Sequence, residues 1–139
     1  MSNDKTDEAI IEMLKKDSRQ SFVEIGEKLG LSESAIRRRV KSLTDGGTIK
    51  KFTIETGDAN STSAIILISV DSATDTSKVS AKLVKLAGIH TVFEITGQYD
   101  IAAIIRAPTI TDINICIDSL RKVPGVFDTN TVIILRTVA

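Results

Sequence analysis

Three short segments in the second half of the chain are apolar at almost every position: residues 64–68 (AIILI), 101–105 (IAAII) and 132–135 (VIIL). They are far too short to cross a bilayer, so we interpret them as β-strands. A strand whose sheet has one face in water alternates apolar and polar residues. That alternation fails here, which predicts a sheet that is buried on both faces.

Segments with helical spacing separate these strands. The predicted order is strand, helix, strand, strand, helix, strand over residues 62–71, 74–88, 89–97, 99–107, 109–123 and 125–138, with Val79, Leu83 and Leu86 on the inward side of the first helix. This βαββαβ order is that of a ferredoxin-like fold, in which both helices cover one face of an antiparallel sheet. The other face needs a further partner. A second copy of the sheet is the simplest candidate, and the N-terminal half of the same chain is the alternative.

Capping signals divide the N-terminal half into helices. Asp4 or Thr6 can cap a first helix that carries Ile10, Ile11 and Leu14. Ser21 followed by Glu24 is the pattern of a capping box and predicts a second helix, with Val23, Ile25 and Leu29 on its buried side. Gly30 then suits a left-handed helix end. The two helices and the turn GLS at residues 30–32 are typical of a helix-turn-helix.

A third helix should begin after the capping residue Ser32 and bury Ile36, Val40 and Leu43 on one face. The opposite face is cationic, with Arg39 at its margin. Residues 48–55 alternate enough to form a strand or small ribbon, which we expect to act as a wing. The predicted DNA contacts are Ser32, Ser34, Ala35, Arg37, Arg38, Arg39 and Lys41 on the helix, with Lys50 and Lys51 on the wing as phosphate contacts.

The overall charge gives no hint of a nucleic-acid partner, because 18 basic residues cancel 18 acidic ones. The local distribution is more informative: residues 36–51 hold six basic side chains and only one acid, Asp45. Phosphate recognition depends on such a local patch and not on the total charge. The alternative is an ordinary solvated helix face, which the surrounding helix-turn-helix pattern makes less attractive.

The chain resembles the Lrp/AsnC, or feast/famine, family of transcription regulators. The resemblance lies in Asp7, Ile10, Ile11, Leu14 and Arg19, in residues 29–52 (LGLSESAIRRRVKSLTDGGTIKKF), and in the segments ITGQYDIAAIIRA and VPGVFDTNTVIIL. It implies an α+β chain with a winged helix-turn-helix DNA-binding domain at 1–52, a linker strand at 53–61, and a ferredoxin-like ligand-sensing and oligomerisation domain at 62–139. The ending TNTVIILRT is similar to archaeal members linked to lysine biosynthesis.

The same resemblance implies a small effector, typically an amino acid, bound between dimers that often assemble further into octamers. Carried over by position, the effector site would consist of Gly97, Gln98, Tyr99, Asp100, Thr129, Asn130 and Thr131. This sequence has Gln98 where many members carry an acid. Gly97 and Asp100 also have a plain interpretation as residues of a hairpin turn. The two interpretations stay open at this point.

Other classes of protein find little support. His90 and Cys116 are the only residues of their types, and neither lies in a motif with a catalytic partner. We therefore expect no enzyme, no metal site and no cofactor. A cytoplasmic protein is expected, because no signal peptide or membrane span precedes the domain and one cysteine forms no internal disulfide. The main rival to a DNA-binding regulator is a metabolite-binding oligomerisation module that does not bind DNA.

Overall fold

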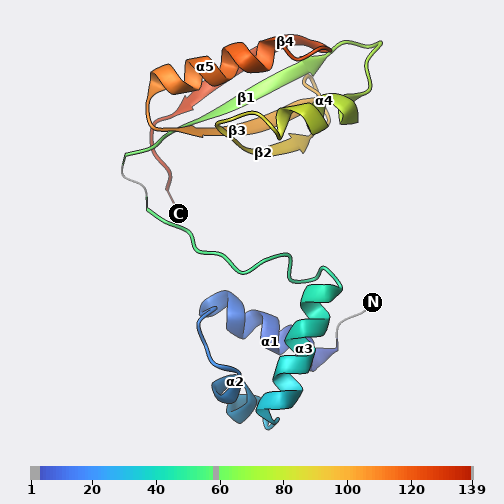
Figure 1. The fold of residues 1–139 in the computed structure, drawn as a ribbon, viewed down its shortest axis with the longest axis vertical. Coiled ribbons are helices and arrows are strands. Elements are labelled where there is room, and N and C mark those ends of the chain that lie inside the picture. The colour runs from blue at the N-terminus through green and yellow to red at the C-terminus, as the bar shows by residue number, and fades with distance from the viewer. Residues whose placement is uncertain (1–3, 58–59, 139) are drawn as a thin grey trace. The chain divides into compact units, whose positions relative to one another are not determined.

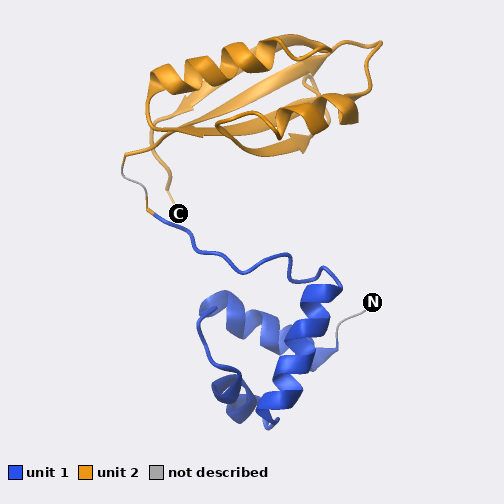
Figure 2. Ribbon diagram, in the orientation of Figure 1, with its two compact units in different colours: residues 1–56 blue, residues 57–139 orange. Residues whose placement is uncertain are grey.

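The computed structural model describes residues 4–57 and 60–138. The chain divides into two compact units, Met1–Thr56 and Gly57–Ala139, which are coloured separately in Figure 2. The division lies inside the predicted linker at 53–61. Each unit has its own hydrophobic core.

Helix caps define the N-terminal unit, which contains α1 (Lys5–Lys16), α2 (Phe22–Leu29) and α3 (Glu33–Asp45) (Figure 1). The Asp4 carboxylate accepts from the backbone N–H of Asp7 at 2.8 Å, and so it caps α1. Ser21 and Glu24 form the complete capping box at 3.1 and 3.0 Å. Ser32 accepts from the N–H of Ala35 at 3.2 Å. The three predicted helix starts are confirmed.

The core of this unit consists of Ile10, Leu14, Ile25, Ile36, Val40 and Leu43. The prediction that Val23 lies on the buried side of α2 is wrong, because Val23 is 53% exposed. Residues three or four positions apart share a helix face, so the face that carries Ile25 also carries Phe22 and Leu29. Val23, two positions from Ile25, points away from it.

A close backbone approach shapes the turn between α2 and α3. Gly30 has φ of 67°, the left-handed conformation predicted for it, and the N–H of Leu31 donates to the carbonyl of Gly26 at 2.9 Å. A Cβ atom at Gly26 would lie 2.4 Å from the Leu31 carbonyl oxygen. Only glycine therefore fits at position 26 without a shift of the turn.

The predicted wing is absent from the described residues. Residues 48–57 form neither helix nor strand, so neither the ribbon at 48–55 nor this part of the linker strand at 53–61 is present. Residues 58–59 of that linker lie outside the described residues. A strand needs a paired neighbour, and the one backbone hydrogen bond found here joins the N–H of Ile49 to the Leu43 carbonyl at 3.0 Å. Phe52 and Ile54 are exposed.

The C-terminal unit has the predicted βαββαβ order: β1 (Thr62–Val70), α4 (Thr76–Leu83), β2 (Ile89–Glu94), β3 (Ile101–Ala107), α5 (Ile110–Arg121) and β4 (Val126–Ile134) (Figure 1). The strands pair in the order β2-β3-β1-β4, and every pair is antiparallel. The central strands β1 and β3 are therefore flanked by two edge strands.

One face of this sheet is covered by both helices. A single core cluster joins Ile66 of β1 and Ala103 of β3 to Val79 and Leu83 of α4 and to Leu120 of α5. Leu86, which follows α4, packs against the cluster while half-buried. The predicted inward residues of the first sensor helix are confirmed.

Candidate nucleic-acid interface and ligand pocket

The exposed side of α3 carries the predicted contact residues. Ser34, Arg37, Arg38 and Lys41 are exposed, and Ala35 is half-buried. The hydroxyl of Ser32 already caps the helix and lies 3.1 Å from the hydroxyl of Ser34. The N-terminal half of α3 therefore presents two arginines and a serine hydroxyl to solvent.

Arg37 is held by two neighbours that the sequence analysis did not name. Its Nη2 atom donates to the Glu33 carboxylate one helical turn earlier. Its guanidinium also lies over the ring of Phe22 on α2, with 5.3 Å from Cζ to the ring centroid, which is a cation–π contact. The side chain of Arg37 thus has a carboxylate partner and an aromatic contact within the free protein.

Arg39 faces the body of the unit. Its Nη1 atom lies 2.8 Å from Asp4 Oδ2 and 2.9 Å from Asp7 Oδ1, so the guanidinium joins α3 to the start of α1. Hydrogen bonds to Asp4 and Asp7 raise the pKa of Arg39. The backbone N–H of Asp7, followed by Arg39, lowers the pKa of Asp4. This placement gives Arg39 a structural role within the N-terminal unit, and its DNA contact stays a prediction.

The remaining cations of the patch differ in whether they have a partner. Lys41 lies 2.6 Å from the Asp45 carboxylate, which raises the pKa of the lysine. Arg38, Lys50 and Lys51 make no ion pair or side-chain hydrogen bond to any other described residue. Arg38 is thus the cation of α3 that can accept an external anion without first losing a carboxylate.

The loop that joins β2 to β3 contains the first four predicted effector residues, and its bonds are structural. Gly97 has φ of 112°. The Asp100 carboxylate accepts from the backbone N–H of Val70 at 2.8 Å, and the N–H of Asp100 donates to the Ile68 carbonyl at 3.0 Å. Across the loop itself, the N–H of Ile95 donates to the Asp100 carbonyl at 2.9 Å, which fits the hairpin interpretation of Gly97 and Asp100. Gln98 and Tyr99 lie between them in the loop.

Thr129, Asn130 and Thr131, the other predicted effector residues, line a pocket of about 630 Å³ between α5 and β4. The loop residues 97–100 do not line it, so this pocket brings together only three of the seven. Thr131 Oγ1 is buried without a hydrogen-bond partner, and Arg121 Nε donates to Thr129 Oγ1 at 3.1 Å. The rest of the lining comes from Ile110, Asn114, Ile117, Asp118, Arg121 and Ile133.

The sequence analysis missed the polar residues that α5 contributes to this pocket. Asn114, Asp118 and Arg121 follow one another at intervals of four and three residues, which places them on one helix face. That face adjoins the apolar stripe of Ile113, Ile117 and Leu120, which is buried. The spacing was therefore a usable signal, but only the pairing of β4 at the sheet edge shows that the stripe meets the threonines.

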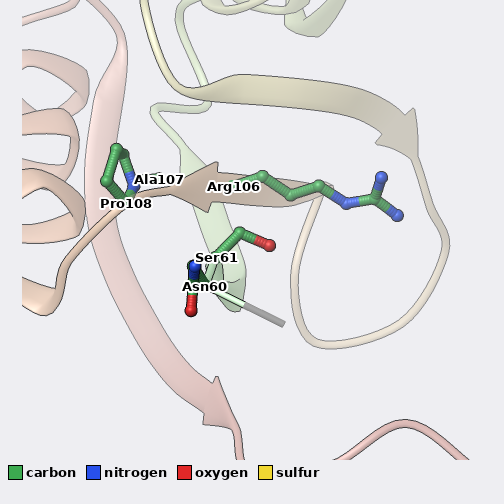
Figure 3. A pocket seen from close by; sticks show the side chains of 5 residues that line it. All are labelled: Asn60, Ser61, Arg106, Ala107 and Pro108. Atoms are coloured by element: carbon green, nitrogen blue, oxygen red, sulfur yellow. The ribbon is translucent and has the colours of Figure 1, made fainter. Parts of the chain in front are cut away.

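A second pocket, of about 350 Å³, lies where β1 begins and β3 ends. Its lining residues are Asn60, Ser61, Arg106, Ala107 and Pro108 (Figure 3). Figure 3 shows the Arg106 guanidinium directed away from the other side chains of the group. This pocket contains none of the predicted site residues.

The sheet face opposite the helices is apolar and uncovered within its own unit. Residues directly opposite in an antiparallel pair share a face, and Ile65 pairs with both Ile104 and Val132, while Leu67 pairs with Ala102. Val132 is exposed and the others are only half-buried. The predicted two-sided apolar character is confirmed for β1 and β3. In the last strand it is incomplete, because Leu135 lies beyond the end of β4.

Two family models match the chain. The AsnC-type helix-turn-helix domain matches residues 4–44, and the Lrp/AsnC ligand binding domain matches residues 63–139. Curated relatives align along nearly their whole length. The HTH-type transcriptional regulator LysM of Saccharolobus solfataricus is 42% identical over 134 residues, which are 96% of this chain and 94% of the relative. The HTH-type transcriptional regulator FL11 of Pyrococcus abyssi is 39% identical over 140 residues, which are 99% of this chain and 92% of the relative.

Solved structures show the same architecture. LrpC of Bacillus subtilis aligns with a TM-score of 0.81 and 29% identity over 100% of this chain and 99% of that one. A transcriptional regulator of Neisseria meningitidis, solved in complex with L-methionine, aligns with a TM-score of 0.86 and 25% identity. The alignment covers 99% of this chain and 93% of that one.

A helix-turn-helix unit with exposed arginines on α3, joined to a βαββαβ unit that matches a ligand-binding domain, defines a transcriptional regulator of two domains. Within that class, the chain belongs to the Lrp/AsnC family, as its resemblance predicted. Among the described residues, no helix combines the length and the apolar character needed to cross a membrane.

Proposed function

We propose that the protein binds specific duplex DNA by inserting α3 into the major groove. Ser34, Ala35, Arg37 and Arg38 would face base edges, because the N-terminal part of a recognition helix reaches them. An arginine fork matches the two acceptors of guanine, and a serine hydroxyl pairs with several bases. Lys41, Lys50 and Lys51 would contact phosphates. The observation that supports this proposal most directly is that Arg37 and Arg38 are both exposed in the N-terminal half of a capped helix.

We propose in addition that two copies pair through the uncovered sheet face. Ile65, Leu67, Ala102, Ile104 and Val132 form a continuous apolar surface there. A surface of this kind is stabilised when it is removed from water, and a second copy offers the same surface. The dimer would carry two recognition helices, so its site should be roughly palindromic, with half-sites about 34 Å apart or a multiple of that.

The pocket between α5 and β4 is our candidate for the effector site. Arg121 can bind a carboxylate, and the exposed Asp118 one turn away can bind an ammonium group, which together suit an α-amino acid. The buried Thr131 hydroxyl has no hydrogen-bond partner among the described residues, and a polar ligand in the pocket could supply one. The complex of the Neisseria regulator with L-methionine supports this ligand class. The loop at 97–100 would contribute through a neighbouring dimer.

Salt dependence tests the DNA-binding proposal. A protein that neutralises phosphates with lysine and arginine loses affinity steeply as salt rises, because counterions are released on binding. We expect binding of duplex DNA in dilute buffer and a linear fall of the logarithm of affinity with the logarithm of salt concentration. If no duplex is bound at any salt concentration while amino acids still raise the melting temperature, the chain is a metabolite-binding module and this proposal fails.

A further inference from the structure

The recognition helix is less cationic than its sequence suggests. Of its four basic side chains, three have carboxylate partners within the N-terminal unit: Glu33 for Arg37, Asp4 and Asp7 for Arg39, and Asp45 for Lys41. Arg38 has none among the described residues. The helix therefore approaches DNA with most of its positive charge already compensated.

Glu33 stands out among these acids because its partner is a proposed base-reading residue. It lies at the first position of α3, where the helix dipole favours a negative charge, and it holds Arg37 from one turn away. Phe22 supports the same guanidinium from α2. The side chain of Glu33 is 37% exposed and that of Arg37 is 65% exposed, so the carboxylate is the less exposed partner of the pair.

We infer that Glu33 is a specificity-determining residue, which keeps Arg37 available to neutral base edges and opposes its capture by phosphates. This inference rests on the proposed DNA-binding function. A guanidinium has five N–H donors, and one bond to Glu33 leaves others for the O6 and N7 atoms of guanine. A phosphate is an anion, so it competes with the Glu33 carboxylate for the positive charge of Arg37. Replacing one anionic partner of Arg37 by another adds little to the binding free energy.

The two kinds of DNA should thus respond differently to the loss of Glu33. Random DNA offers Arg37 mainly phosphates, so the carboxylate weakens binding there. On a specific site, Arg37 donates to uncharged acceptors while the Glu33 pair persists, so the carboxylate costs little. The ratio of the two affinities is the specificity of the protein.

The test compares the affinities of Glu33→Gln and the wild type for two DNA duplexes. Each duplex has about 30 base pairs, or three helical turns. One has a random sequence, and the other is enriched by the wild-type protein from a random pool. We expect the variant to bind the random duplex roughly 3- to 10-fold more tightly, with a salt slope steeper by about 0.9, the value for one more phosphate contact. On the enriched duplex we expect a change of less than about twofold.

Glu27→Gln is the matched control, because it removes the same charge from an exposed residue of α2 that has no partner among the described residues. The inference is overturned if this control reproduces the gain, if Glu33→Gln tightens binding equally on both duplexes, or if it changes neither. These outcomes leave the proposed function in place. Failure of the wild type and both variants to bind any duplex would overturn the proposed function as well.

Discussion

The carboxylate of Asp100 accepts a hydrogen bond from the backbone N–H of Val70, with 2.8 Å between Oδ2 and N. The two residues are 30 positions apart, and the bond ties the β2–β3 loop to the end of β1. We therefore expect Asp100→Ala to destabilise the C-terminal unit by about 1–3 kcal/mol, the net contribution of a part-buried hydrogen bond to a charged acceptor. Urea unfolding measures this. Asp100→Asn keeps an acceptor oxygen and should restore most of the loss, whereas an Ala variant as stable as the wild type would rule out this structural role.

Arg38 and Arg39 are neighbours in the sequence with opposite expected roles. Arg39→Met removes the bonds to Asp4 and Asp7, so it should lower the urea midpoint of the N-terminal unit, which the amide resonances of residues 5–45 report. Arg38→Met should leave that midpoint unchanged and cost about 1–3 kcal/mol of binding on an enriched duplex, since it removes a base contact. An equal loss on random DNA would reassign Arg38 to a phosphate.

The pH dependence of the N-terminal unit should report the Asp4 carboxylate. Its folded pKa lies below the ordinary 3.8, mainly because of the Asp7 N–H and then because of Arg39. A lowered folded pKa stabilises the unit above the unfolded value, and this contribution is lost as the pH falls through the folded value. Asp4→Asn keeps a good cap without the charge. The variant should be less stable than the wild type at neutral pH, and the difference should vanish well below pH 3.8. A constant difference would exclude the titration of Asp4 as its source.

The effector pocket can be tested by a thermal-shift screen of the amino acids. A ligand that binds only the folded state raises the melting temperature with its concentration. We expect Arg121→Met to abolish the shift that the best amino acid gives, because it removes the carboxylate partner. Arg136→Met removes the same charge from an exposed residue outside the pocket and should keep the shift. Retention of the full shift by Arg121→Met would exclude the pocket between α5 and β4.

Local signals in the sequence predicted the helix starts and the strand order correctly. Ser21 with Glu24, Ser32 and Gly30 act within one turn of the chain, and the apolar segments around Ile66 and Ala103 follow from burial alone. The local signals did not indicate contacts between residues far apart in the sequence. Arg39 finds Asp4 and Asp7 more than 30 positions earlier, and the position of Asp100 opposite Val70 requires the folded sheet.

The ribbon at residues 48–55 fails for a related reason. Phe52 and Ile54 alternate with polar residues as a strand would, but no neighbouring segment of the described chain pairs with them. Alternation predicts an extended segment, and only a partner makes it a strand. The pocket shows the same limit. Thr129, Asn130 and Thr131 follow from the resemblance, while their neighbours Asn114, Asp118 and Arg121 become visible once α5 lies beside β4.

The central claim is that two chains joined by their apolar sheet faces present two α3 helices to one duplex. Selection of bound sequences from a pool of random duplexes by the full-length protein tests it most directly. We predict enrichment of sequences with two-fold symmetry, whose half-sites lie about 10 base pairs apart or a multiple of that. Enrichment of one asymmetric half-site would contradict the paired arrangement, and a bound pool no different from the starting pool would contradict specific DNA binding itself.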